Sequence, residues 1–223
     1  MNPKNAWQAL WEHYIISAEM GKRIAEAARD KGVDADPNGI QFATWMHDVA
    51  RLATHEFLRN DAITERLLTS WDIPESMRND SPSLRKFLGA AEKLSLDEEQ
   101  KRFKKALTPE QEKQARDFYD SLSPTQKILN YCDSLGKRGP KGLFDSASYI
   151  EYLRSQESRY GQASPWPSVS YAIERREAAS VLYAYVIEKT AKWLQERGVD
   201  LVAIHKGLAN YGPKFVLFVR HGE

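Results

Sequence analysis

Apolar residues recur at helical spacing along most of the chain, and this period limits the fold more than any other feature of the sequence. The first segment shows it plainly, because a stripe of residues at i, i+3, i+4 and i+7 spacing is followed by Gly32. The stripe comprises Trp7, Leu10, Trp11, Tyr14, Ala18, Gly21, Ala25 and Ala28. The spacing predicts one amphipathic helix over about 4–31, with His13 at the edge of its apolar face.

The same period predicts further helices. A second helix is expected over about 38–60, and helical patterns resume after Asp61 and after Pro74. The expected apolar face of the second helix consists of Phe42, Trp45, Met46, Val49, Ala53 and Phe57. Ser123 and Pro124 are expected to begin another helix, with Ile128, Cys132 and Leu135 inward. A last long helix is expected over about 168–197, before Gly198, with Val169, Ile173, Ala179, Val186 and Trp193 as core positions.

The segment 77–123 is the most polar part of the chain, with charges of both signs at helical spacing. This pattern predicts exposed helices with i, i+4 pairs and argues against disorder. Only "KFVLFVRH" near the C-terminus has the composition of a β-strand. We therefore expect an all-α fold, a compact multi-helix bundle with a short terminal strand, in one domain that spans 1–223.

Charge and cysteine content exclude several classes of protein. The chain has 32 basic and 31 acidic residues, a formal net charge of +1, so we expect no nucleic-acid partner and no electrostatic binding to a membrane. Cys132 is the only cysteine, which excludes an internal disulfide. The sequence shows neither a secretion signal nor a run of about 20 apolar residues, so we expect a soluble, cytoplasmic protein.

The stretch "ATWMHDVARLATHEF" at 43–57 places a histidine and an aspartate side by side within the second helix. Turning 100° per residue brings Asp48, Arg51 and His55 onto one face, with Thr44 beside them and His47 to one side, opposite the expected apolar face. This face is either the solvated side of an amphipathic helix or a side turned toward other helices, where a histidine and a carboxylate share a cation. Helical periodicity does not decide between the two.

Two further residues complete a pattern around this pair. His13 lies 34 residues before His47, and Asp133 lies far downstream on an apolar helix. The arrangement resembles the HD-domain metal-dependent phosphohydrolase superfamily. "MHDVARL" is similar to the "LHDIGK" or "LHDIGR" of that family, although Ala50 stands where the family has glycine. "THEFLRNDAITERLLTSWDIPESM" is similar to the segment that follows the pair in many members.

The resemblance implies an HD-domain-like helical core over about 4–140, with a helical extension over about 141–223. It also implies a metal held by His13, His47, Asp48 and Asp133. Imidazole and carboxylate ligands suit Mn, Ni, Co, Fe, Zn or Mg. The implied activity is hydrolysis of a small phosphorylated substrate, a phosphomonoester or a nucleotide, by a metal-activated water, with Asp48 as a catalytic residue.

Other polar residues are candidates for contact with the substrate or for proton transfer. Arg51, Lys137 and Arg138 are candidate phosphate ligands, the last two within the glycine-rich turn "SLGKRGPKG". Lys137 is alternatively an i, i+4 partner of Asp133, and Arg138 a favourable charge at a helix C-terminus. His55 is a candidate substrate contact, with a plain surface histidine as the alternative. Related enzymes place acidic residues shortly after the pair, so the candidate general acids or bases are Glu56 and Asp61.

Two competing interpretations remain. "KFVLFVRHGE" resembles the opening of a histidine phosphatase, whose phosphorylated residue would be His221, but only two residues follow it here, so we expect a coincidental strand and tail. The chain could also be a non-catalytic HD-like sensor or partner-binding module. That alternative predicts that the side-chain tips of His13, His47 and Asp133 lie more than about 6 Å apart, too far to share a metal whose bonds are about 2.0 to 2.2 Å.

Overall fold

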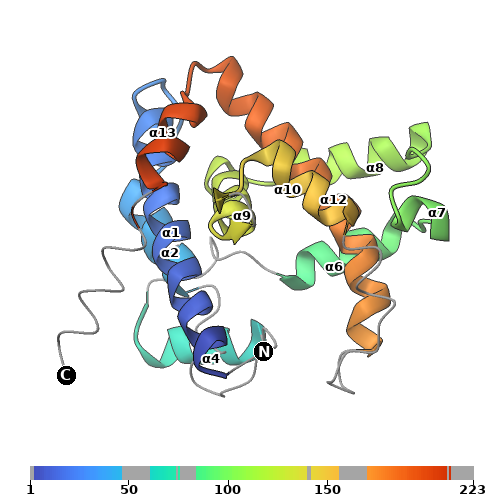
Figure 1. Cartoon of the computed structure of the whole chain (residues 1–223), viewed down its shortest axis with the longest axis horizontal. Coiled ribbons are helices and arrows are strands. Elements are labelled where there is room, and N and C mark those ends of the chain that lie inside the picture. The colour runs from blue at the N-terminus through green and yellow to red at the C-terminus, as the bar shows by residue number, and fades with distance from the viewer. Residues whose placement is uncertain are drawn as a thin grey trace.

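The long first helix lies on one side of the molecule with the shorter second helix beside it, and the helices of residues 84–120 lie on the other side (Figure 1). The computed structural model describes residues 3–46, 61–73, 75, 84–139, 142–155, 170–209 and 211. These residues form ten helices and one small antiparallel hairpin, in which β1 pairs with β2. The prediction of an all-α fold is confirmed. The predicted terminal strand over 214–221, with His221, lies outside the described residues.

The helices up to α8 cover the first half of the chain. They are α1 (Pro3–Arg29), α2 (Pro37–Met46), α4 (Asp61–Ser70), α6 (Leu84–Lys93), α7 (Glu98–Lys101) and α8 (Pro109–Asp120). The remaining elements are α9 (Pro124–Leu135), β1 (Arg138–Gly139), β2 (Gly142–Leu143), α10 (Ser146–Ser155), α12 (Ser170–Glu196) and α13 (Leu201–Leu208). None of the described helices is long and apolar enough to cross a membrane.

Local signals in the sequence determine where these helices begin and end. Gly32, in the turn that ends α1, adopts a φ of +80°, a backbone conformation that most side chains disfavour, and Val33 N–H donates to the Ala28 carbonyl at 3.0 Å. Ser123 caps α9 and Pro124 lies in its first turn, as predicted. Two further reciprocal caps, at Asp97 and Thr108, begin α7 and α8.

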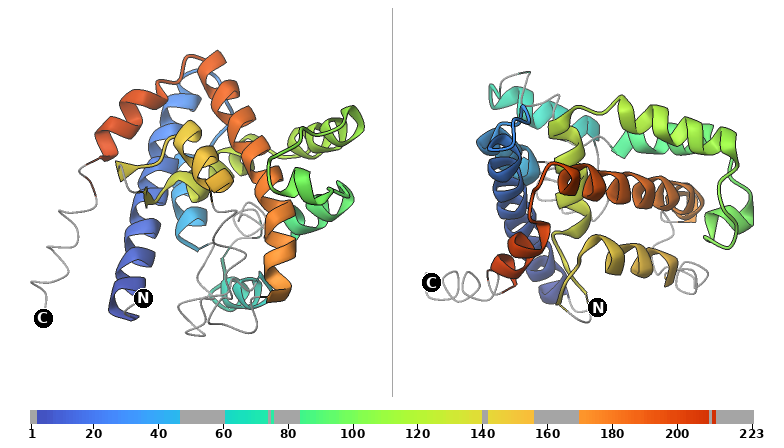
Figure 2. Two further views of the ribbon diagram at one scale, coloured as in Figure 1. Left: turned by 45° about the vertical axis from the view of Figure 1, so that its right-hand side comes forward. Right: turned by 90° about the horizontal axis from the view of Figure 1, so that it is seen from above.

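The buried side chains form two cores. The α1–α9 core, built mainly by α1, α2, α9, α12 and α13, includes Ile16, Met20, Ile24, Ile40, Ile128, Tyr131, Leu135 and Ile187. The α6–α8 core includes Phe87, Ala91, Ala115, Tyr119, Leu182 and Val186. Seen from above (Figure 2), α12 runs between α10 and the pair α6 and α8, and it contributes residues to both cores.

The predictions of buried residues on α1, α9 and α12 are largely confirmed. Tyr14, Ala18, Ala25 and Ala28 are buried on α1, as are Ile128, Cys132 and Leu135 on α9, and Ala179 and Val186 on α12. Trp11 was expected in the core, but it is 55% exposed. The side chains of Trp7, Leu10 and Ile173, and Val169 as a whole, lie outside what the structure describes.

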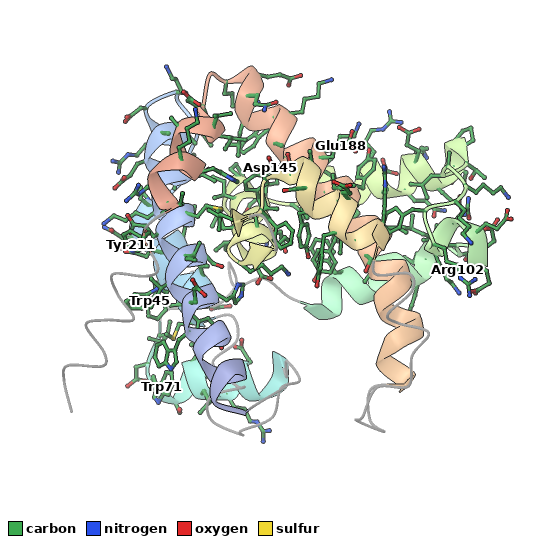
Figure 3. The ribbon with its side chains drawn as sticks, viewed as in Figure 1. Trp45, Trp71, Arg102, Asp145, Glu188 and Tyr211 are labelled. Atoms are coloured by element: carbon green, nitrogen blue, oxygen red, sulfur yellow. The ribbon has the colours of Figure 1, made fainter. Side chains whose placement is uncertain are left out.

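The apolar face predicted for the second helix is wrong in the part that can be compared. On α2 the buried residues are Pro37, Ile40, Ala43 and Thr44, whereas Trp45 is 49% exposed and points outward (Figure 3). Ile40, Ala43 and Thr44 also follow helical spacing, so the period was correct and the choice of face was not. The Thr44 hydroxyl donates to the Ile40 carbonyl at 2.7 Å, which satisfies the buried polar group. Val49, Ala53 and Phe57 lie outside the described residues.

The polar segment 77–123 forms exposed helices, as predicted, and also contributes buried residues to a core. Mixed-charge pairs such as Lys113 with Asp117 are present on α8, as predicted. The same segment also supplies most of the α6–α8 core, which its low apolar content did not indicate.

Candidate functional site

Two of the four predicted metal ligands, far apart in the sequence, lie next to each other. His13 on α1 and Asp133 on α9 approach to 3.3 Å between Nε2 and Oδ1. Both side chains are largely buried, with exposed fractions of 14% and 20%. The helices therefore bring an imidazole and a carboxylate into direct contact at a partly enclosed position.

Two small residues allow the close approach of α1 to the end of α9. An ideal Cβ built on Gly136 would lie 2.6 Å from the Cα atom of Ser17, closer than real side-chain carbons come to backbone atoms. Ser17 is fully buried, one helical turn after His13 on the same face of α1. Its hydroxyl lies 3.1 Å from His13 Nδ1 and donates to the Gly136 carbonyl at 3.4 Å.

The Gly136 carbonyl determines which nitrogen of His13 carries the proton. His13 Nδ1 lies 3.1 Å from this oxygen, and because a carbonyl oxygen only accepts, Nδ1 must be the donor. In the neutral ring Nε2 is then unprotonated and directs its lone pair toward Asp133. Nε2 and Oδ1, 3.3 Å apart, are both electron-pair donors, and they are atom types that bind divalent metal ions.

The geometry of the pair is compatible with a shared metal ion. Two ligands at about 2.0 to 2.2 Å from one ion, with an angle between octahedral (90°) and tetrahedral (109.5°), lie about 2.8 to 3.6 Å apart. Metal-binding histidines commonly donate their other ring nitrogen to a backbone carbonyl, as His13 does to Gly136. The donor set and its orientation therefore fit a borderline or hard divalent ion.

Lys137, a candidate phosphate ligand from the sequence, contacts Tyr149 near the end of α9 that carries Asp133. Lys137 Nζ donates to the Tyr149 hydroxyl at 3.3 Å, with the ammonium 4.6 Å from the centre of the ring. Burial, and then the negative charge of Asp133, raise the pKa of Tyr149, so its hydroxyl stays protonated at neutral pH. Lys137 is thus held at the same end of α9 as Asp133.

Most of the other predicted site residues cannot be compared with the structure. His47, Asp48, Arg51, His55 and Glu56 lie outside the described residues. Asp61 begins α4 and Arg138 begins β1, but their side chains are not described. Within the described parts of the chain, no three His, Cys, Asp or Glu side chains come together as a metal-binding group.

Sequence reasoning missed Ser17, Gly136 and Tyr149. Gly136 was noted only as part of a glycine-rich turn, and nothing in the local pattern around Ser17 or Tyr149 indicates a contact with residues far away in the sequence. Their roles follow only from the crossing of α1 with α9 and from the position of α10.

The described chain defines an all-α protein with a partly buried histidine–aspartate pair at a helix crossing. Comparison with protein-family models, with curated proteins and with solved structures finds no match. The likeness to HD-domain enzymes therefore remains a prediction from the residue pattern.

Proposed function

We propose that the chain binds a divalent metal ion through His13, His47, Asp48 and Asp133 and hydrolyses a small phosphate ester. The contact of His13 with Asp133 carries this proposal, because the predicted ligand set required those two residues to meet. A partly buried imidazole and carboxylate, with the ring held by a second hydrogen bond, are also the arrangement that a metal site needs.

The buried face of α2 gives independent support for the other two ligands. Thr44 is buried against α1, where Gly21 leaves room for it. By helical spacing Asp48 is expected on the same face as Thr44, one turn later. His47 and Asp48 follow α2 directly, and α2 packs against the helix that carries His13. Thus the polar residues of 43–57 are expected on a side that faces other helices.

The surrounding residues would have distinct tasks in such a site. A bound ion would supply Lewis-acid activation of water and of a phosphoryl oxygen. Gly136 holds the proton of His13 at Nδ1 and leaves Nε2 available as a ligand. Lys137, held by Tyr149, provides a positive charge for the phosphate group of the substrate.

Metal analysis of the purified protein tests the proposal. The wild type is expected to retain about one equivalent of Mn, Ni, Co, Fe or Zn and to hydrolyse p-nitrophenyl phosphate when that metal is supplied. His13→Ala and Asp133→Asn are each expected to lower metal affinity by more than about tenfold and to abolish hydrolysis. Circular dichroism of each variant should match the wild type.

Asp117→Asn is the matched control, because Asp117 is an exposed carboxylate on α8 with a side chain 65% exposed. It should leave metal content and hydrolysis unchanged. If the wild type takes up none of these metals at micromolar concentration, the enzyme proposal fails and the non-catalytic module becomes the better interpretation.

A further inference from the structure

A cavity of about 360 Å³ lies between α10, α12 and the turn that joins α7 to α8. None of the residues predicted for the metal site lines it. Its volume is within the range of small-molecule binding sites. Glu188, which lines it, lies on α12 where that helix passes α10 (Figure 3).

Apolar and aromatic side chains form much of the wall. Phe103 and Leu107 come from the turn, Ile150 from α10, and Val181 and Tyr185 from α12. Phe103 has a φ of +58°, a left-handed conformation that a bulky residue rarely adopts. Such conformations gather at functional sites, where the surrounding structure holds them in place.

The turn that carries Phe103 is held in place by a pair of glutamines. Gln100, which is 2% exposed, donates through Nε2 to the Ala106 carbonyl at 3.1 Å and to Gln111 Oε1 at 2.6 Å. Gln111 donates in return to Gln100 Oε1 at 3.0 Å. Because these amide contacts bind both ends of the turn, this wall of the cavity is formed in advance of any ligand.

The charges around the cavity are mainly positive. Lys104, Lys105 and Arg154 line it together with one carboxylate, Glu188. Lys105 is paired with Asp97 at 2.8 Å. The Arg154 guanidinium lies over the Phe103 ring, 5.9 Å from its centre, and no carboxylate of the described chain forms an ion pair with it. Arg154 therefore places a planar guanidinium, which can donate two parallel hydrogen bonds to a carboxylate, next to an aromatic surface.

We propose that this cavity binds a small aromatic carboxylate. The ring of the ligand packs against Phe103, Val181 and Tyr185, and its carboxylate accepts hydrogen bonds from Arg154. The apolar wall alone would accept a neutral aromatic compound, so the positive charge determines the preference for an anion.

Calorimetric titration with 2-naphthoate tests the proposal, with the neutral 2-naphthamide as the matched ligand. The wild type is expected to bind 2-naphthoate saturably at one site and to bind 2-naphthamide at least about tenfold more weakly. Arg154→Gln is expected to weaken 2-naphthoate binding by about tenfold or more and to remove the preference between the two compounds. Arg197→Gln is the control, because Arg197 also lies over an aromatic ring, 4.8 Å from the centre of Trp193, away from the cavity.

A second variant tests whether the ligand binds in the cavity, independently of the charge of Arg154. Ala106 lines the cavity and is exposed, so Ala106→Trp fills the space with little risk to the core. It should weaken binding of both compounds. The proposal is overturned if 2-naphthoate does not bind saturably, if 2-naphthamide binds equally well, if Arg197→Gln has the effect of Arg154→Gln, or if Ala106→Trp leaves binding unchanged. None of these results depends on a metal ion.

Discussion

At the scale of single residues, the contact between His13 and Asp133 depends on a position without a side chain. Gly136 lies against Ser17, and its carbonyl also accepts a hydrogen bond from His13 Nδ1. The same residue therefore controls both the distance between α1 and α9 and the orientation of the imidazole.

Gly136→Ala is expected to destabilise the protein and to separate the pair. The new methyl group would meet the backbone of Ser17, which cannot move aside as a flexible side chain would. Overpacking of this kind lowers the free energy of unfolding by about 1 to 3 kcal/mol, measurable by urea denaturation. Metal affinity should fall together with stability.

Gly89→Ala is the matched control for this substitution. Gly89 lies within α6, and an added Cβ there meets no atom within 4 Å. Alanine at an open helical position should raise stability, by up to about 1 kcal/mol. If both alanine variants behave alike, close contact with Ser17 does not explain the role of Gly136.

The residues of the candidate site were predictable only in part. His13 and Asp133 were found because their spacing around the His47 and Asp48 pair resembles the ligand pattern of HD-domain enzymes. Ser17 and Tyr149 are common residue types whose importance comes from contacts with distant segments. Such contacts depend on how helices cross, which local spacing does not specify.

At the scale of elements, caps and glycine stops were predictable, and the buried face of α2 was not. Ser123, Gly32 and Gly198 act within a few residues, so the sequence alone indicates the helix ends. On α2, however, Phe42 and Trp45 on one side and Ile40 and Ala43 on the other are all apolar. Only packing against α1 selects the buried side.

Helix α13 carries a titratable group within its packed face, so its packing should depend on pH. Burial lowers the pKa of His205, with the charge of Asp145 in partial opposition. The imidazole lies edge-on to Tyr131, at 6.3 Å between ring centres. Because the unfolded chain keeps a histidine pKa of about 6.5, it binds more protons than the folded chain just below that pH. The contribution of the neutral His205 to folding stability is therefore present above about pH 6.5. It is lost as the pH falls through the lowered pKa of this histidine in the folded chain.

The wild type should lose more stability than His205→Gln between about pH 7.5 and about pH 5.5, measured by urea denaturation. Glutamine remains neutral throughout, which removes the proton uptake at this position. Lys206→Gln, an exposed neighbour on α13, should keep the pH dependence of the wild type. Equal pH dependence in the wild type and His205→Gln would mean that the imidazole is not protected from protonation.

At the scale of the whole molecule, α12 connects the two cores. Leu182 is 1% exposed in the α6–α8 core, and Ile187, five residues later, is fully buried in the α1–α9 core. The helix also packs against α6, α9 and α10 (Figure 2). An opening of either core would remove part of the support for the other, so we expect the two cores to unfold together.

Leu182→Ala and Ile187→Ala test this coupling from opposite sides. Each removes a buried aliphatic group and should lower the free energy of unfolding by about 2 to 5 kcal/mol. If α12 couples the cores, each variant lowers hydrogen-exchange protection equally in peptides from α8 and from α9, since both are exposed in the same opening. Val202→Ala, a truncation at a residue 61% exposed on α13, should change protection by less than about 0.5 kcal/mol. Loss of protection in α8 alone for Leu182→Ala, and in α9 alone for Ile187→Ala, would instead mean two independently stable domains.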